Sequence, residues 1–276
     1  MKLKQKTAII TGASRGIGAT IARVFAEEGA SLILCSRTSE VENVAAQIRT
    51  IGCNAAVYRV DVSQVVDVHR MIKDALSNFD RIDILVNNAG IYGPIGQLWK
   101  NDQASWRNTV AVNLFGTVNC ITSVLPHMIE RRKGKIINLA GGSEGAFPRF
   151  SAYACSKSAV VRLTETLAEE LMEYNIDINS IAPGPVNTRL LDEVLAAGAE
   201  AGSFYEKALK QKQGGGISAD RAAELAVFLA SDASDKITGR LLSAIWDDWR
   251  SLKASSLAGR ALYQMKRIDD QRFKEV

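Results

Sequence analysis

Short apolar runs alternate with longer amphipathic stretches along the whole chain of 276 residues. The short runs are bounded by turn residues and predict buried strands. We expect these strands at residues 7–10, 31–35, 55–60, 82–86, 135–139, 176–181 and 241–245. Apolar residues at helical spacing predict helices at 16–28, 40–51, 63–78, 103–131, 151–174 and 218–229. Ser63 is expected to cap the third of these helices.

This alternation predicts an α/β fold of the Rossmann type, a doubly wound parallel sheet of about seven strands with helices on both faces. Right-handed crossovers place the loops that follow the strands along one edge, where open sheets of this kind bind ligands. Gly12, Asn88, Ala140 and Pro183 each follow a predicted strand and fall on that edge.

No linker, repeat or low-complexity block divides the chain. We therefore expect residues 1–249 to form one dinucleotide-binding domain, followed by a helical tail at 250–276. The segment at about 188–216 is rich in alanine and glycine and is the expected lid over a substrate.

Composition narrows the class of protein. Apolar residues make up 47% of the chain, enough for a large core, yet no run of 18 apolar residues predicts a membrane span. The basic N-terminus leads into a strand and has no signal-peptide pattern, so we expect a cytoplasmic protein. Four cysteines without CxxC spacing and two histidines predict neither a disulfide framework nor a metal site. A net charge of +4 points to no nucleic-acid partner.

A glycine-rich loop, TGASRGIG over residues 11–18, joins the first predicted strand to the first predicted helix. Gly12 permits a sharp turn, while Gly16 and Gly18 let backbone approach a pyrophosphate and let the helix pack on the sheet. The N-terminus of that helix favours a phosphate group through its free N–H groups and its dipole. The loop therefore predicts a dinucleotide site, and the alternative is an ordinary glycine turn.

Charge near the second predicted strand favours NADP(H) over NAD(H). Proteins that bind NAD place a carboxylate at the end of this strand, but here Arg37 stands there and no acid does. Arg37 and Arg15 are expected to meet the 2′-phosphate of NADP, unless both are solvated surface charges. Asp61 is placed either to accept from the adenine amino group or to cap the helix near Ser63.

Tyr153 and Lys157 are four residues apart in a predicted helix and share one face. A free phenol has a pKa of about 10. We expect a nearby ammonium and a positively charged nicotinamide ring to lower the pKa of Tyr153 and to make it an acid/base group. The alternative is a packed tyrosine beside an exposed lysine.

These motifs, together with NNAG at residues 87–90 and Asn113, resemble those of the short-chain dehydrogenase/reductase family over roughly residues 5–245. The resemblance implies hydride transfer, with Tyr153 as acid/base, Lys157 as its partner and Asn113 holding a water that relays protons to Lys157. It also implies a homodimer or homotetramer. The candidate cofactor-binding residues are Gly12, Ser14, Arg15, Gly16, Ile17, Gly18, Arg37, Asp61, Val62, Asn88, Ala89, Gly90, Tyr153, Lys157, Pro183, Gly184 and Thr188.

One departure from the family concerns the group that holds the substrate oxygen. Members usually place a serine thirteen residues before the tyrosine, where this chain has Ala140. Losing one such donor costs on the order of 3 kcal/mol of transition-state stabilisation. Ser143 follows two glycines and is the predicted replacement; the alternatives are a loop serine without a role, or a bond from the substrate or a backbone N–H. The catalytic candidates are Asn113, Ser143, Tyr153 and Lys157.

The C-terminus also departs, because Trp246 and Trp249 stand where members often have a Val-Asp-Gly-Gly stretch. The tail beyond them predicts an amphipathic helix packed on its own subunit. Alternatively, the two tryptophans and the tail form a wall of the substrate pocket or cross to a neighbouring subunit. The tail's apolar residues at helical spacing are Ala258, Ala261, Leu262 and Met265.

The sequence thus predicts an NADP(H)-dependent oxidoreductase that moves hydride between the nicotinamide and a carbonyl or secondary alcohol of a small molecule. Ala140 motivates one alternative, a related cofactor-binding protein with weak or no catalysis. The other alternative, a nucleotide-sugar epimerase or dehydratase, is disfavoured by the spacing of the glycines.

Overall fold

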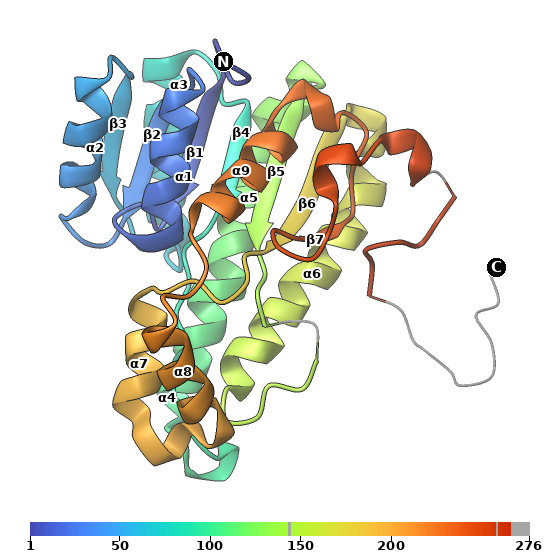
Figure 1. The fold of residues 1–276 in the computed structure, drawn as a ribbon. Coiled ribbons are helices and arrows are strands. Elements are labelled where there is room, and N and C mark those ends of the chain that lie inside the picture. The colour runs from blue at the N-terminus through green and yellow to red at the C-terminus, as the bar shows by residue number, and fades with distance from the viewer. Residues whose placement is uncertain (143–144, 258, 266–276) are drawn as a thin grey trace.

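The computed structural model describes residues 1–142, 145–257 and 259–265, and in this part of the chain seven parallel strands form one sheet (Figure 1). Their order is β3-β2-β1-β4-β5-β6-β7. The order reverses between β1 and β4, which creates the crevice where doubly wound sheets bind ligands. The strands are β1 (Thr7–Thr11), β2 (Ser31–Ser36), β3 (Ala55–Arg59), β4 (Ile84–Asn87), β5 (Gly134–Leu139), β6 (Ile176–Ala182) and β7 (Leu241–Ser243).

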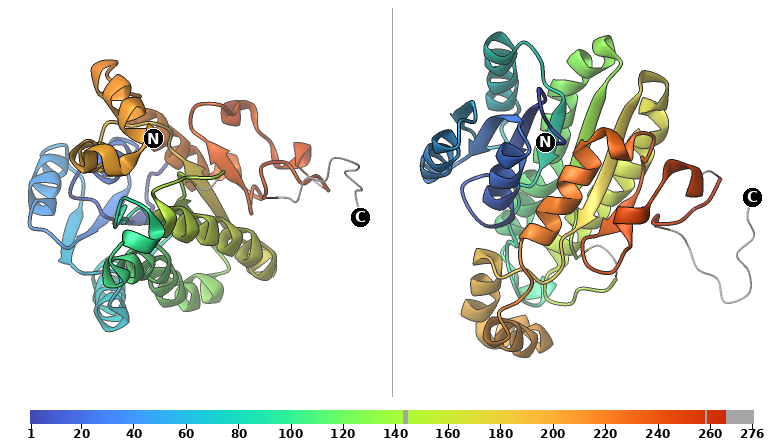
Figure 2. Two further views of the ribbon diagram at one scale, coloured as in Figure 1. Left: turned by 90° about the horizontal axis from the view of Figure 1, so that it is seen from below. Right: turned by 45° about the horizontal axis from the view of Figure 1, so that its top comes forward.

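Helices cover both faces of the sheet (Figure 2). The strands are apolar on both sides for this reason: Ile10 and Leu34 pack toward α1 and α9, whereas Ile9 and Ile33 pack toward α3 and α5. The predicted fold class is confirmed. The α-helices are α1 (Gly16–Glu27), α2 (Val41–Thr50), α3 (Val65–Phe79), α4 (Gln103–Val110), α5 (Gly116–Arg131), α6 (Ser151–Leu171), α7 (Arg189–Ala197), α8 (Ser203–Gln213) and α9 (Asp220–Ala230).

The helix predicted at 103–131 is continuous in extent but contains a π-helical turn, Ala111–Phe115, between α4 and α5. There the N–H of Gly116 donates to the carbonyl of Ala111, one residue further back than in an α-helix. By length and composition alone, Gln103–Arg131 is apolar enough to cross a membrane. Its α5 part packs on α3 and β4, a placement typical of a core helix.

One local prediction is wrong, and a second is not met in the residues that the structure describes. Ser63 does not cap α3, which begins at Val65 after Gln64; its hydroxyl and N–H instead donate to Asp61 Oδ1, at 2.7 and 2.9 Å. The described tail residues form two 3-10 turns, Trp249–Ser251 and Ala254–Ser256, and no helix.

The tail is irregular because the body of the protein takes up its backbone groups. The Arg240 guanidinium donates to the carbonyls of Arg260 and Leu262, and the N–H of Leu241 in β7 donates to the carbonyl of Tyr263. Gly259 also has a left-handed backbone, with φ of +68°. Ala258 and residues 266–276 lie outside the described residues.

The predicted lid segment folds into α7 and α8, which lie together beyond the carboxyl ends of the strands (Figure 1). Thr188 occupies the position before α7, and a β-carbon added to Gly16 would lie 3.3 Å from its Cγ2. The segment therefore starts directly beside the glycine-rich loop.

Candidate active site

The glycine-rich loop has the geometry of a phosphate cradle. Gly12 and Gly16 adopt left-handed backbone conformations, with φ of +64° and +53°. A β-carbon at Gly18 would lie 2.3 Å from the carbonyl oxygen of Gly12, so α1 can approach the loop only with glycine there. Arg15, at the N-cap of α1, provides no side-chain cap, which leaves the N–H groups of the first turn available to an anion.

The loop after β4 holds the cradle in place. Thr11 Oγ1 accepts the N–H groups of Asn88 and Ala89, both at 3.0 Å. The Asn88 amide donates to the carbonyls of Thr11 and Gly12 at 2.9 and 3.1 Å. The first and fourth strands are thus joined at their carboxyl ends, at the reversal point of the sheet.

Two adjoining cavities open along this edge, of about 250 and 700 Å³. They share lining residues such as Ile17 and Gly90, so they form one continuous site. The smaller cavity is lined by predicted cofactor residues Gly12, Ser14, Arg15, Gly16, Ile17, Gly18, Arg37, Asn88, Ala89, Gly90 and Thr188. The larger cavity adds Tyr153, Lys157, Pro183 and Gly184. Neither cavity is lined by the two remaining candidates, Asp61 and Val62.

Arg15 and Arg37, two of the three arginines that line the smaller cavity, each have a carboxylate neighbour. Arg15 lies 3.3 Å from Glu40, Arg37 lies 3.4 Å from Asp61, and the two arginine side chains are 41% and 51% exposed. Partial burial raises the pKa of Asp61, but the bonds from Ser63 and the Arg37 charge outweigh it and hold the pKa below its usual value. Asp61 therefore pairs with Arg37, and it does not cap α3.

Tyr153 and Lys157 face the larger cavity from α6, and both are buried. Lys157 Nζ donates to the carbonyl of Leu139 at 2.7 Å and lies 5.9 Å from the centre of the Tyr153 ring. The alternative of an exposed lysine is excluded, since Lys157 is only 4% exposed.

Burial sets the pKa of both groups. It lowers the pKa of Lys157 to about 8, and it raises the pKa of Tyr153 far above its usual value, with a smaller contribution from Tyr92. The expected lowering of the Tyr153 pKa by the ammonium is wrong for the protein alone. Loss of hydration outweighs Lys157, whose ammonium is directed to a backbone carbonyl.

Asn113 lies in the π-helical turn and is fully buried. Its Oδ1 accepts the Ile91 N–H at 2.9 Å, and its Nδ2 donates to the Ile91 carbonyl and to Ser156 Oγ at 2.9 and 3.0 Å. A β-carbon at Gly90 would lie 3.2 Å from Asn113 Oδ1 and 3.4 Å from Lys157 Nζ. The side chain therefore connects the β4 loop to α6, close to the lysine.

Ala140 is fully buried against Val160 and Val161 and does not line the cavity. The residues at the cavity wall after β5 are Gly141 and Gly142. The residue thirteen positions before Tyr153 therefore lies in the core. Gly141 and Gly142, which follow it at the cavity wall, have no side chain that could donate a hydrogen bond. Ser143 lies outside the described residues.

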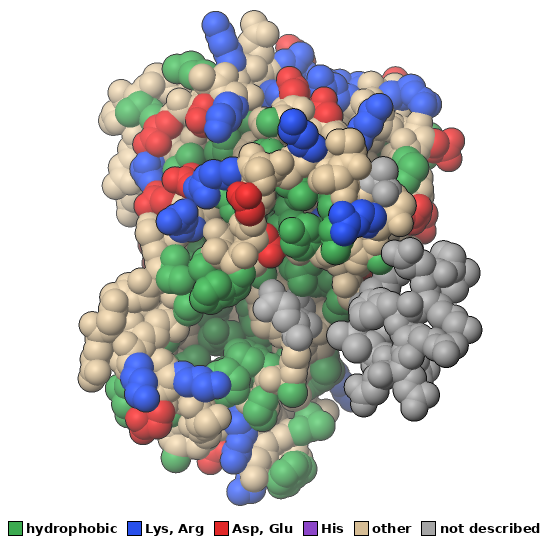
Figure 3. Space-filling model, turned by 45° about the vertical axis from the view of Figure 1, so that its right-hand side comes forward, with side chains coloured by type: hydrophobic (Ala, Val, Ile, Leu, Met, Phe, Trp, Pro, Cys, Tyr) green, Lys and Arg blue, Asp and Glu red, His purple; other side chains and the backbone are tan. Residues whose placement is uncertain are grey.

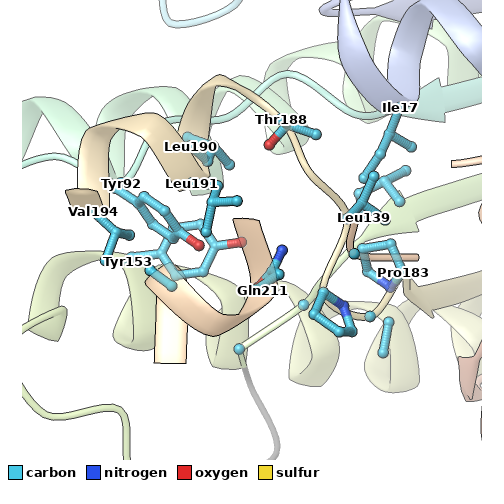
Figure 4. Close-up of a pocket in the computed structure, with 18 of the residues that line it drawn as sticks. Ile17, Tyr92, Leu139, Tyr153, Pro183, Thr188, Leu190, Leu191, Val194 and Gln211 are labelled. Atoms are coloured by element: carbon cyan, nitrogen blue, oxygen red, sulfur yellow. The ribbon is translucent and has the colours of Figure 1, made fainter. Parts of the chain in front are cut away.

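Sequence reasoning missed the aromatic wall of the larger cavity. The rings of Tyr92 and Tyr153 meet edge to face with centroids 4.6 Å apart (Figure 4). Those of Phe147 and Phe204 do so at 4.5 Å. Figure 3 shows apolar side chains gathered around this hollow. Tyr92 stands two residues after Gly90 of the NNAG motif, and that adjacency was the only available signal.

The two tryptophans of the C-terminal region separate in the structure. Trp246 lines the larger cavity and is 81% exposed. Trp249 is buried and stacks on Phe228, with ring centroids 5.7 Å apart. Only Trp246 agrees with the prediction of a pocket wall.

Comparisons of the sequence and of the structure with known proteins agree on one family. Residues 6–198 match the family model for short chain dehydrogenase. Oxidoreductase UcpA of Salmonella typhimurium is 37% identical over 246 residues, 86% of this chain and 92% of its own. Cis-4-hydroxycyclohexanecarboxylate dehydrogenase of Sinomonas cyclohexanicum is 33% identical over 87% of this chain and 94% of its own. The crystal structure of NAD+-bound xylitol dehydrogenase superposes with a TM-score of 0.82 at 29% identity, over 88% of this chain and 98% of its own. The chain therefore belongs to the short-chain dehydrogenase/reductase family of oxidoreductases, whose members bind a nicotinamide cofactor.

Proposed function

We propose that this protein is an NADP(H)-dependent oxidoreductase acting on a carbonyl or secondary alcohol of a small molecule. The observation that carries the proposal is the position of Tyr153 and Lys157, both buried in the wall of the larger cavity where it adjoins the glycine cradle. The glycine cradle would hold the cofactor, whose nicotinamide would supply or accept the hydride. The protein's own groups then handle the proton.

In the reductive direction, Tyr153 gives its phenol proton to the substrate oxygen. Its raised pKa keeps the phenol protonated until an acceptor arrives. Lys157 is fixed by its bond to Leu139, and it favours the phenolate once the proton has left. Asn113, held by Ile91 and Ser156, is the proposed anchor for a water that returns protons to Lys157.

The choice of NADP(H) is supported by the guanidinium groups of Arg15 and Arg37, two of the three arginines that line the smaller cavity. Each is about half exposed, so each has room to turn from its carboxylate neighbour toward a 2′-phosphate. NAD(H) is the competing cofactor, because the similar xylitol dehydrogenase is described as bound to NAD+.

The substrate class follows from the cavity walls. Aromatic and aliphatic side chains surround Tyr153, and this lining favours a compact apolar substrate over a multiply charged one. A relative named for a hydroxylated cyclohexane acid supports testing cyclic ketones first.

The deciding experiment mixes the protein with NADPH or NADH and a panel of cyclic and linear ketones, and follows the loss of reduced nicotinamide absorbance. We expect turnover with NADPH and its loss in Tyr153→Phe, which should still bind the cofactor. Turnover with NADH only would contradict the assigned role of Arg37. Cofactor binding without any turnover would favour a protein with no catalysis, the alternative to which Ala140 and Gly141 point.

A further inference from the structure

The stretch that follows β5 brings no serine hydroxyl to the described cavity wall. Ser243 lines this wall from β7, and its Oγ accepts the N–H groups of Ile245 and Trp246 at 3.3 and 3.2 Å. Tyr153 has to deliver a proton, and a carbonyl oxygen that gains negative charge is stabilised by a second donor aimed at the same point. Within the described residues, Ala140 faces the core and Gly141 and Gly142 bring no side chain to the wall. Among the described residues, a second donor has to come from an element other than the stretch after β5.

Tyr92 lies beside the catalytic phenol. The two rings meet edge to face, with centroids 4.6 Å apart and planes at 72°. In Figure 4 the phenol oxygens of Tyr92 and Tyr153 both point into the cavity, on the same side. Both hydroxyl groups therefore face the cavity from adjacent rings.

The orientation of the Tyr92 side chain is fixed by its neighbours. Its neighbour Ile91 is bonded through both its N–H and its carbonyl to Asn113. The Tyr92 ring also packs edge-on against Phe150, with centroids 5.2 Å apart. A donor held in this way needs no reorganisation when charge develops on the substrate.

The Tyr92 hydroxyl is available to donate. Burial, and to a lesser extent the Glu193 carboxylate, raises the pKa of Tyr92 to about 12, so the phenol keeps its proton at neutral pH. Gln211 also lines the cavity, but its amide already donates to Asn187 Oδ1 at 3.0 Å. Lys207 lies over the Phe204 ring, with its Nζ 4.8 Å from the ring centre.

We propose that Tyr92 is a catalytic residue whose hydroxyl donates a hydrogen bond to the substrate carbonyl oxygen, in place of the missing serine, while Tyr153 supplies the proton. The proposal rests on the proposed function as a carbonyl reductase. It changes the expected reacting constellation from a serine and a tyrosine to two tyrosines.

The test is Tyr92→Phe, which removes the hydroxyl and keeps the ring. We expect kcat to fall by about a hundredfold, with KM changed far less and with unchanged NADPH affinity and melting temperature. Tyr174→Phe is the matched control, because it loses a hydroxyl in the 3-10 turn that follows α6, outside both cavities, and should retain full activity.

A second variant tests whether a hydroxyl placed elsewhere in the cavity wall can replace that of Tyr92. Gly141 lines the same cavity, and a β-carbon there would lie 3.1 Å from Pro183 Cδ, a contact that a slight shift relieves. We expect Gly141→Ser to restore about tenfold of the lost kcat when it is added to Tyr92→Phe, within the range of one hydrogen bond to a developing charge.

Three outcomes would overturn the proposal. In the first, Tyr92→Phe turns over like the wild type while Ser143→Ala loses activity, which would return the role to Ser143. In the second, the loss in Tyr92→Phe appears in NADPH affinity or is not relieved by Gly141→Ser. In the third, the wild type reduces no ketone at all; this would end the proposed function together with the inference, whereas the first two leave the proposed function standing.

Discussion

The ammonium of Lys157 is buried, and its burial lowers the unfolding free energy of the protein. Burial lowers its pKa from 10.5 to about 8, which corresponds to about 3 kcal/mol of preference for the neutral amine. Below pH 8 the folded and unfolded chains both carry the charge, so the full cost applies. Between pH 8 and 10.5 the unfolded chain binds more protons, and stability rises with pH.

This linkage gives a prediction for Lys157→Met, which lacks the buried charge. We expect the unfolding free energy of the wild type to rise by about 2 kcal/mol between pH 7 and pH 10, relative to that of the variant over the same range. Urea unfolding at the two pH values measures this gain. Lys73→Met, at an exposed position on α3, should show no such change. An equal difference between wild type and Lys157→Met at both pH values would mean that the amine is hydrated in solution.

Among single residues, the sequence predicted those site residues that act together with a residue close by in the chain. Tyr153 and Lys157 were found because four residues on a helix define one face. Tyr92 and Phe147 were not, because they reach the cavity from separate loops that only the folded sheet brings together. Ala140 was misplaced for a related reason, since residue counting does not say which way a loop side chain points.

The elements themselves were largely predictable. Each apolar run became a strand of the sheet because helices bury both of its faces, and seven separate runs leave few other arrangements. The π-helical turn at Ala111–Phe115 could not be predicted, because the apolar spacing over 103–131 is helical throughout. The turn contains Asn113, whose bonds to Ile91 the sequence does not show. The described part of the tail, up to residue 265, differs from its prediction for the opposite reason: its apolar spacing is helical, but its carbonyls bond to Arg240 and β7 instead of to a helix of their own.

Arg240 is therefore expected to hold the tail. Its guanidinium donates to the carbonyls of Leu257, Arg260 and Leu262, at 3.4, 3.0 and 2.7 Å. In Arg240→Ala we expect chymotrypsin to cleave after Tyr263 sooner than in the wild type, while the sheet keeps its melting temperature within a few degrees. Chymotrypsin is suitable because the substitution removes none of its cleavage sites.

Arg107→Ala serves as the control for this experiment, since Arg107 is exposed on α4 and lies far along the chain from the tail. Its digestion pattern should match that of the wild type. If Arg240→Ala were cut at the wild-type rate, the tail would be held by its apolar contacts and by Met265, whose N–H bonds to Glu165.

For the whole molecule, the main consequence of the fold is that one site joins distant parts of the chain. The two cavities are lined by the loops after β1, β2, β4, β5 and β6, by the start of α1, by helices α6 to α8, and by Ser243 and Trp246 at and after β7. A ligand that fills them contacts both halves of the sheet and the lid segment together. Binding to the folded chain alone must then stabilise the whole domain by mass action.

The cofactor choice can be measured through this coupling, without knowledge of any substrate. A ligand at a hundred times its Kd stabilises the folded state by about 2.7 kcal/mol, which raises the melting temperature of a domain of this size by several degrees. At equal concentrations, we expect a larger rise with NADPH than with NADH. Arg37→Ala should shrink the difference, whereas Arg70→Ala, an exposed arginine on α3 outside both cavities, should preserve it. An equal or larger rise with NADH would show that the Arg37–Asp61 pair stays closed and that the site takes a 2′-hydroxyl, because a guanidinium held by a carboxylate gives a phosphate little advantage.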